Sequence, residues 1–337
     1  MLFHFSSVTR QYTEQSFLMD VFSFGFAGVD IFFVISGFII SYTTICLPTG
    51  LANLKTYLLK RIVRVYAIYW LVIACFLFLQ LTFPSQYKTP FPLDLGNLAA
   101  TVLLLPGHIM LNGVSWTLTH EIFFYLCFSV IFFIPSRKTF LACTSTIVIF
   151  LLIIYSFGLH PPDSNVLFDL LFFPMNIEFG LGVIAAMVFG YLPERLCMPL
   201  IVAGATMFFF FAAHQQNNPL ADPGSFQRVV MFGIPPFLMV AGLCRLELKG
   251  NVGGSGFLWS LGNASYSLYL LHLPVVVVVV KYSDFFINSP LIYNLVLVSA
   301  SGALVLFSMW FYRKVERPLT RMLSQLIVKR VSASTIS

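Results

Sequence analysis

Charged residues are scarce in this sequence. Only 9% of its 337 residues are Asp, Glu, Lys or Arg, whereas 58% are hydrophobic. A soluble domain of this length needs far more polar surface, so the composition excludes that class and predicts an all-α, polytopic membrane helical bundle. We find no secretory signal, no internal repeat and no long linker, and we therefore expect one membrane-embedded domain over residues 1–337.

Cysteines are also few, and they form no motif. The six thiols lie in or beside apolar segments, without the pairing that metal ligands show. Such residues act as small hydrophobic side chains, so we predict neither a disulfide framework nor a metal site. They are Cys46, Cys75, Cys127, Cys143, Cys197 and Cys244.

Long apolar runs make up most of the chain. Runs of about twenty residues predict nine full membrane spans, because that length of helix crosses a bilayer. Met1–Val8 is interpreted as the remaining end of a truncated first helix, which gives ten helices in all. The nine spans are expected near residues 22–44, 65–83, 115–135, 139–158, 165–189, 197–213, 227–245, 257–281 and 291–312.

Lysine and arginine divide unevenly between the predicted loops. If the spans alternate in direction, 15 of the 19 fall on one side, and Arg10, Lys88, Arg228 and Lys281 fall on the other. Cytoplasmic loops carry such an excess, so we predict a cell (inner) membrane protein with a cytoplasmic tail from about residue 313. The net charge of +6 then reflects topology, and we expect no nucleic acid partner.

Asp30 stands in the body of the first full span. An ionisable side chain there is costly unless it faces protein or a wet cavity, which makes Asp30 a candidate functional residue. Small and polar residues recur around it at steps of three and four, so this stripe should face other helices as a site or as a packing seam. The stripe comprises Ser23, Ala27, Asp30, Val34, Gly37 and Ser41.

Three further spans combine an ionisable side chain with other residues on the same helix face. Glu178 shares its face with a proline and a glycine, which predicts a close helix approach or a local kink. Each ionisable side chain alone could be a core residue whose hydrogen bonds are made within the bundle. A helical bundle in lipid needs none of them for stability, however, so several together favour a functional site. The sets are Thr117, Glu121 and Tyr125; Pro174, Glu178 and Gly182; and Ser265, Tyr269 and His272.

Arg61 and Arg64 precede the second predicted span. At a spacing of three they share a helix face, and two neighbouring guanidinium groups suit a phosphate-bearing ligand. The alternative is that they only anchor the helix at the cytoplasmic surface.

Taken together, these motifs resemble the acyltransferase 3 family of membrane O-acyltransferases, and in particular its exopolysaccharide-modifying branch. The resemblance covers nearly the whole chain. It implies transfer of an acyl group, usually acetyl from cytoplasmic acetyl-CoA, to a hydroxyl of a glycan or other acceptor, with no permanently bound cofactor. The matching segments are Gly28–Phe38, Arg61–Arg64, Ser115–Tyr125, Glu178–Gly182, Ser265–His272 and Glu316–Pro318.

The resemblance also implies roles for single residues. His4 matches the family's first-helix histidine and would be the general base or a transient acyl carrier, since a hydroxyl attacks a thioester poorly until a base takes its proton. Arg61 and Arg64 would hold the phosphates of CoA. Asp30 or Glu121 would orient the imidazole or bind sugar hydroxyls. Further candidates for acceptor binding are Ser36, Tyr125, Glu178, Tyr269 and His272.

Two departures from the family pattern bear on these roles. Met1–Val8 cannot span a bilayer, so we expect His4 to sit on a weakly held stub. His120 stands where near relatives would have Tyr or Asn, which predicts an altered acceptor preference.

Several alternatives stay open at this level. A transporter or flippase of lipid-linked glycan would also use buried carboxylates and arginines, whereas a membrane scaffold would need none of them. The expected partners are acyl-CoA, a hydroxyl acceptor and the lipid bilayer. The motifs do not specify the acceptor or the oligomeric state. They also do not distinguish an acetyl donor from a succinyl donor, or direct transfer from a relay through an acyl-histidine.

Overall fold

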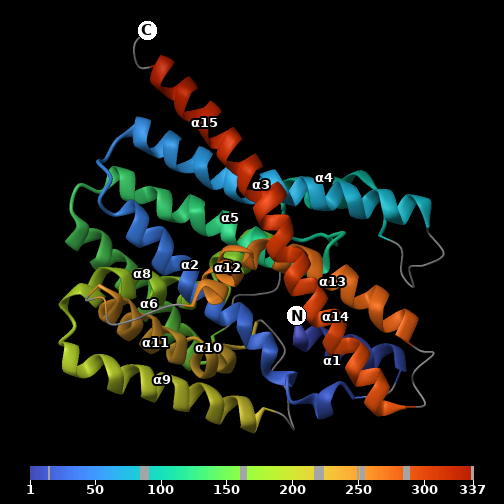
Figure 1. The fold of residues 1–337 in the computed structure, drawn as a ribbon. Coiled ribbons are helices and arrows are strands. Elements are labelled where there is room, and N and C mark those ends of the chain that lie inside the picture. Colours follow the sequence, from blue (N-terminus) through green and yellow to red (C-terminus); the bar gives the residue numbers. More distant parts are fainter. Residues whose placement is uncertain are drawn as a thin grey trace. The chain divides into compact units, whose positions relative to one another are not determined.

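The computed structural model describes residues 1–13, 16–83, 91–159, 165–215, 224–248, 250, 255–283 and 289–334. Every regular element in these ranges is a helix (Figure 1). Nine helical segments of this described part are long and apolar enough to cross a membrane. The predicted all-α polytopic class and the number of full spans are therefore confirmed.

The chain divides into two compact units, each assembled from separate stretches of sequence. Unit 1 comprises Met1–Phe22, Lys55–Ile122 and Gly254–Ser337, and unit 2 comprises Ser23–Leu54 and Phe123–Gly253. The expectation of a single domain over the whole chain stays a prediction.

Unit 1 contains a short first helix, most of the longest helix, and the C-terminal helices. Asp94 caps the short helix α4 (Leu95–Leu103), and its carboxylate accepts the backbone N–H of Asn97 at 3.0 Å. Hydrogen bonds from Asn97 hold the pKa of Asp94 below its ordinary value. The elements are α1 (Leu2–Thr13), η1 (Leu18–Asp20), α3 (Leu51–Thr82), α4 (Leu95–Leu103), η4 (Gly113–Ser115), the start of α5 (Trp116–Phe128), α12 (Gly256–Asn263), α13 (Ser265–Tyr282), α14 (Pro290–Phe311), the π-helical turn η8 (Tyr312–Glu316) and α15 (Arg317–Ser334).

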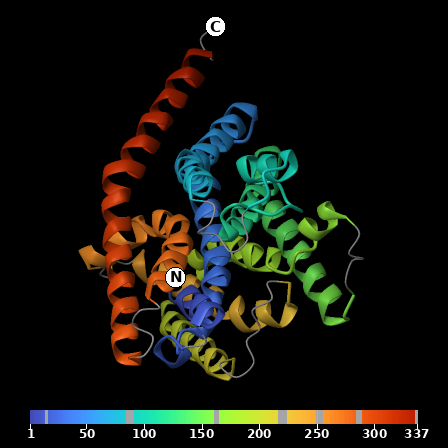
Figure 2. The same cartoon turned by 90° about the vertical axis from the view of Figure 1, so that its right-hand side faces the viewer.

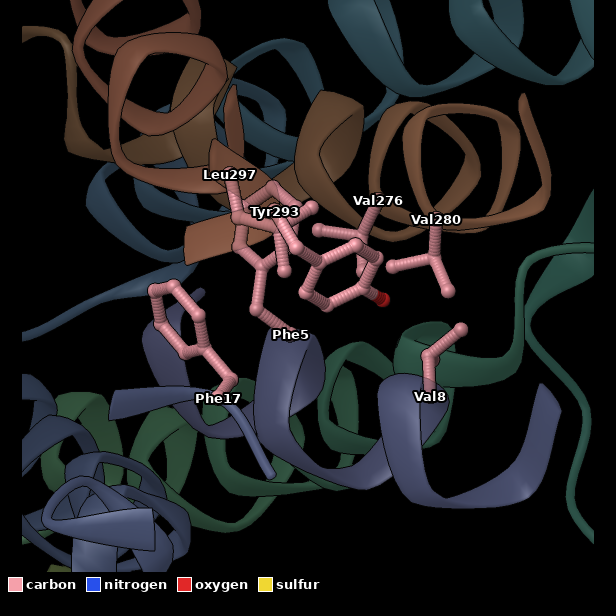
Figure 3. Packing of buried hydrophobic residues seen from close by; sticks show 7 residues of the cluster. All are labelled: Phe5, Val8, Phe17, Val276, Val280, Tyr293 and Leu297. Carbon is pink, nitrogen blue, oxygen red and sulfur yellow. The ribbon is translucent and has the colours of Figure 1, made fainter. Parts of the chain in front are cut away.

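Helix α1 packs against α13 and α14. Its side chains join an apolar cluster with both helices (Figure 3). The Tyr293 hydroxyl also lies 3.3 Å from the Thr9 hydroxyl. The expectation of a weakly held stub is therefore wrong, because the helix continues to Thr13 and its apolar face finds partners. The cluster comprises Phe5, Val8, Phe17, Val276, Val280, Tyr293 and Leu297.

Helices α14 and α15 form one continuous rod through η8 in both views (Figure 1, Figure 2). Pro318 has no N–H to donate to the carbonyl of Lys314, which favours an irregular turn at this point. The predicted cytoplasmic tail is thus helical through Ser334.

Unit 2 is built around helix α2. Two pairs of its helices pack side by side, α2 with α8 and α9 with α11. The elements are η2 (Ser23–Ala27), α2 (Gly28–Thr44), the end of α5, η5 (Ser129–Phe133), α6 (Arg137–Ser156), α7 (Val166–Leu171), α8 (Asn176–Val188), η6 (Phe189–Tyr191), α9 (Glu194–His214), α10 (Phe226–Phe232) and α11 (Ile234–Glu247).

Glycines set the crossing of α2 and α8. A Cβ at Gly37 would collide with the carbonyl of Phe179, and one at Gly182 would collide with the carbonyl of Val34. The two backbones therefore touch, as small residues permit in membrane helices. The close approach predicted beside Glu178 is confirmed.

Several predicted boundaries were inaccurate. Helix α3 begins at Leu51 and not near residue 65, so the basic cluster lies inside a helix. The span expected at 257–281 is divided between α12 and α13 at Ala264. The kink expected at Pro174 is a full break between α7 and α8, where the Asn176 side-chain amide donates to the carbonyls of Leu170 and Leu171 at 2.8 and 2.9 Å.

Candidate active site

Two histidines meet in unit 1. His4 on α1 and His272 on α13 have ring centroids 5.0 Å apart, with the rings tilted by 44°. His272 is buried, and the packing of α1 against α13 holds the two helices together. The structure thus brings together the proposed base and one of the residues assigned to acceptor binding.

The backbone of α13 determines which nitrogen of His272 carries the proton. Its Nδ1 lies 2.6 Å from the carbonyl oxygen of Tyr269 and 3.2 Å from that of Leu268. Carbonyl oxygens only accept hydrogen bonds, so Nδ1 must be the protonated nitrogen. Nε2 is buried and has no hydrogen-bond partner among the described residues. In the neutral ring it therefore presents a lone pair, which is what a base requires.

A proline two residues further along shapes this helix. Pro274 lies inside α13 and cannot donate to the carbonyl of Leu270. The side-chain amide of Asn112 supplies the missing donor at 3.1 Å. The carbonyl of Leu270 therefore has a donor although the proline cannot supply one.

Tyr269 joins α13 to the start of α5. Its hydroxyl lies 2.6 Å from the Thr117 hydroxyl and donates to the carbonyl of Val114. Glu121, one turn after Thr117, is close enough to act electrostatically on the phenols of Tyr266 and Tyr269. Thr117 and Glu121 are buried, as expected for a face that points into protein.

The two arginines of α3 have separate partners in unit 1. Arg64 Nη1 donates to Glu316 Oε1 at 2.8 Å, and the guanidinium lies 5.3 Å from the centre of the Tyr266 ring. The guanidinium of Arg61 lies 5.6 Å from the centre of the Tyr57 ring. Their role in holding CoA phosphates stays a prediction.

Asp30 belongs to an ion pair in unit 2. Arg228 on α10 donates to both of its oxygens, Nη2 to Oδ2 at 2.8 Å and Nε to Oδ1 at 2.9 Å, and both side chains are buried. The guanidinium also donates to the backbone carbonyl of Phe26 at 3.0 Å and lies over the phenyl ring of the same residue. The whole predicted stripe around Asp30 is buried, which confirms that it faces protein. Its carboxylate is thus engaged by arginine, and a catalytic role for it is untested.

Glu178 lies beside this pair. It is completely buried, its carboxyl adjoins that of Asp30, and its side chain packs against Gly233. Ser36 and Tyr125, the other acceptor-binding candidates of unit 2, are also buried. No group of three potential metal ligands occurs in the described part of the chain.

Arg228 and Glu316 are the residues that the sequence reasoning did not assign to a site. Arg228, which the charge division placed among the loops, is buried in α10 within a candidate span. The side of the membrane predicted for it stays a prediction. The sequence contains a hint of the pairing with Asp30, because Arg228 is a positive charge in one apolar run and Asp30 is a negative charge in another. Lys88, counted on the same side, lies outside the described residues.

The class of protein follows from this helical bundle and from the comparison with known families. A family profile described as an acyltransferase domain matches residues 1–313. The chain therefore belongs to the acyltransferase 3 family and is a membrane O-acyltransferase, as the motifs indicated.

A curated relative extends this assignment. The chain is 27% identical over 342 residues to the exopolysaccharide production protein ExoZ of Rhizobium meliloti strain 1021, an alignment that covers 95% of each chain. No solved structure matches the chain significantly.

Proposed function

We propose that this protein transfers an acetyl group from cytoplasmic acetyl-CoA to a hydroxyl group of an exopolysaccharide. The observation that carries the proposal is the contact between His4 and His272, whose free nitrogen is positioned by the backbone of α13. The name of the relative supports the acceptor, and the family supports acyl transfer.

The chemistry requires a base next to the acceptor hydroxyl. His4 accepts the hydroxyl proton while the sugar oxygen attacks the thioester carbonyl. The new C–O bond forms, the C–S bond breaks, and the departing CoA thiolate takes up the proton. The His272 ring lies beside His4, and in this proposal its Nε2 accepts a hydrogen bond from the protonated His4 and so stabilises it.

The surrounding groups supply orientation. Tyr269 and Thr117 form a hydrogen-bonded pair beside His272, and Glu121 provides negative charge one turn away. We propose that these groups bind the hydroxyls of the sugar, because clustered hydroxyl and carboxylate groups are suited to polyol recognition.

The rival interpretation is a transporter or flippase. Membership of an acyltransferase family favours the enzyme. The contact between the two histidines does not separate the classes by itself, because transporters also use buried histidines as proton relays. The buried Asp30–Arg228 pair does not separate the two classes, because it occurs as readily in a structural seam.

The proposal is tested with membrane vesicles that contain the chain. Acetyl-CoA labelled in the acetyl group is supplied together with de-O-acetylated exopolysaccharide, and alkali-labile label on the polymer is measured. We expect labelling with the unaltered chain and none with His4→Ala at equal protein amount. If the chain hydrolyses or binds acetyl-CoA but labels no polymer, the acceptor is wrong; if it does not bind acetyl-CoA, the donor is wrong.

A further inference from the structure

Glu316 is a buried carboxylate at the junction of α14 and α15. Its side chain is only 1% exposed, whereas that of its partner Arg64 is 48% exposed. Oε1 accepts from Arg64 Nη1 at 2.8 Å, and Oε2 accepts from the Ser267 hydroxyl at 2.5 Å. Both oxygens are therefore bonded to groups on two other helices, α3 and α13.

The arginine is held on a second side by aromatic stacking. The Tyr266 ring lies 5.3 Å from the guanidinium, and the Tyr266 hydroxyl donates to the carbonyl of Val65 at 2.7 Å, which fixes the ring to α3 itself. One edge of the Arg64 guanidinium thus contacts the Glu316 carboxylate, and one of its faces lies near the Tyr266 ring. These two contacts restrict the rotation of the guanidinium.

The outer edge of Arg64 is available for a ligand. A guanidinium has five N–H donors, and Arg64 uses one of them in its hydrogen bond to a described residue. A simple surface anchor needs no buried acid, since water and lipid headgroups satisfy an exposed arginine. A buried carboxylate also reduces the local positive potential, so its benefit for an anionic ligand must be geometric.

We propose that Glu316, held by Ser267, is a positioning residue that fixes the guanidinium of Arg64 so that its outer N–H groups bind a phosphate of the acyl-CoA donor. This inference rests on the proposed function, because it takes CoA as the donor. Glu316 is the last residue of the π-helical turn η8. Such turns are frequent at functional sites.

The test separates positioning from simple structural support by steady-state kinetics on the full-length protein in detergent. We expect Glu316→Gln to raise the KM for acetyl-CoA about tenfold and to change kcat by less than about twofold, because the lost charge-assisted bond orients a binding group and no reacting atom. Arg64→Gln should raise KM at least as much. The double variant should match Arg64→Gln alone, since Glu316 acts only through Arg64.

Arg313→Gln is the matched control. Arg313 lies on the same turn and donates to the Ser260 hydroxyl at 3.0 Å, so its removal takes away a nearby positive charge and leaves the Arg64 contact intact. We expect its KM to stay unchanged. The inference is overturned if Glu316→Gln leaves KM unaltered, or if it raises KM equally in the Arg64→Gln background.

Direct binding of coenzyme A, measured by calorimetry, separates this failure from failure of the proposed function. If the unaltered protein binds CoA and Glu316→Gln binds it equally well, the positioning role alone is wrong. If the unaltered protein does not bind CoA, the donor assignment is wrong and the positioning role falls with it.

Discussion

At the scale of single residues, the chemistry depends on which atoms are left without partners. His272 donates through Nδ1 to the backbone, so its Nε2 is the nitrogen with no partner among the described residues. Helix α1 places His4 against that ring. Neither helix alone creates this arrangement, because the two residues are far apart along the chain.

Replacement of either histidine tests the pair. We expect His4→Ala and His272→Ala each to lower kcat by about a hundredfold or more, because a positioned base contributes that much to proton transfer. His214→Gln, at an exposed histidine at the end of α9, should retain full activity. Acetyl transfer per folded protein measures all three, and an active His4→Ala variant would remove His4 from the mechanism.

The buried charges of unit 2 give a second prediction at this scale. One guanidinium can balance only one carboxylate, and Arg228 binds both oxygens of Asp30, so we expect Glu178 to be the neutral carboxyl. Arg228→Met should destabilise the protein by about 3–5 kcal/mol, because it leaves a buried carboxylate without its cation. Glu178→Gln should cost less than about 1 kcal/mol, since it replaces a neutral group by one of the same shape.

Unfolding of the purified protein in increasing denaturing detergent measures both changes. Equal losses for Arg228→Met and Glu178→Gln would contradict this arrangement of charge.

At the scale of elements, close backbone approach determines how helices pair. Helices α2 and α8 touch where Gly37 and Gly182 lack a side chain. In a bilayer, burial of apolar surface does not drive helix pairing, so close packing and polar contacts must supply it. The same reasoning explains why α1 is held by packing on α13 and α14 although it is only 12 residues long.

Added side chains at the crossing should be destabilising. We expect Gly182→Val to cost about 2 kcal/mol or more, because the new atoms collide with the backbone of α2, which cannot move locally. Gly28→Ala is the matched control, since no atom lies within 4 Å of a Cβ added at that position of α2. Thermal stability in detergent compares the two. A Gly182→Val protein as stable as the control would show that the crossing is looser than the structure has it.

At the scale of the whole molecule, the uneven charge of the loops predicts orientation. The basic excess of residues 45–64, between the first two predicted spans, and of the C-terminal end should place both in the cytoplasm. We expect a green fluorescent protein fused after Ser337 to fluoresce, and an alkaline phosphatase fused there to be inactive. A phosphatase fused after Ile109, which lies between the second and third predicted spans and hence on the external side, should be active. The reverse pattern would show the opposite topology.

Much of this organisation could be predicted from the sequence. Apolar length determines the number of spans, because a helix must reach across the bilayer whatever it packs against. Local spacing also predicted the buried face around Asp30 and the close helix approach beside Glu178, since both depend on residues within one helix. The full break between α7 and α8 was not predicted. The boundaries of α3 and α12 were missed, because polar helical turns continue beyond the apolar run that signals a span.

Which charged groups pair was decided only by the tertiary structure. Arg228 and Asp30 are separated by 198 positions, and Arg64 and Glu316 by 252, so no local pattern indicates that they meet. The sequence by itself determined that these costly groups must find partners in a low-dielectric interior. Folding determined which partner each one has, because that depends on the packing of helices that are distant along the chain.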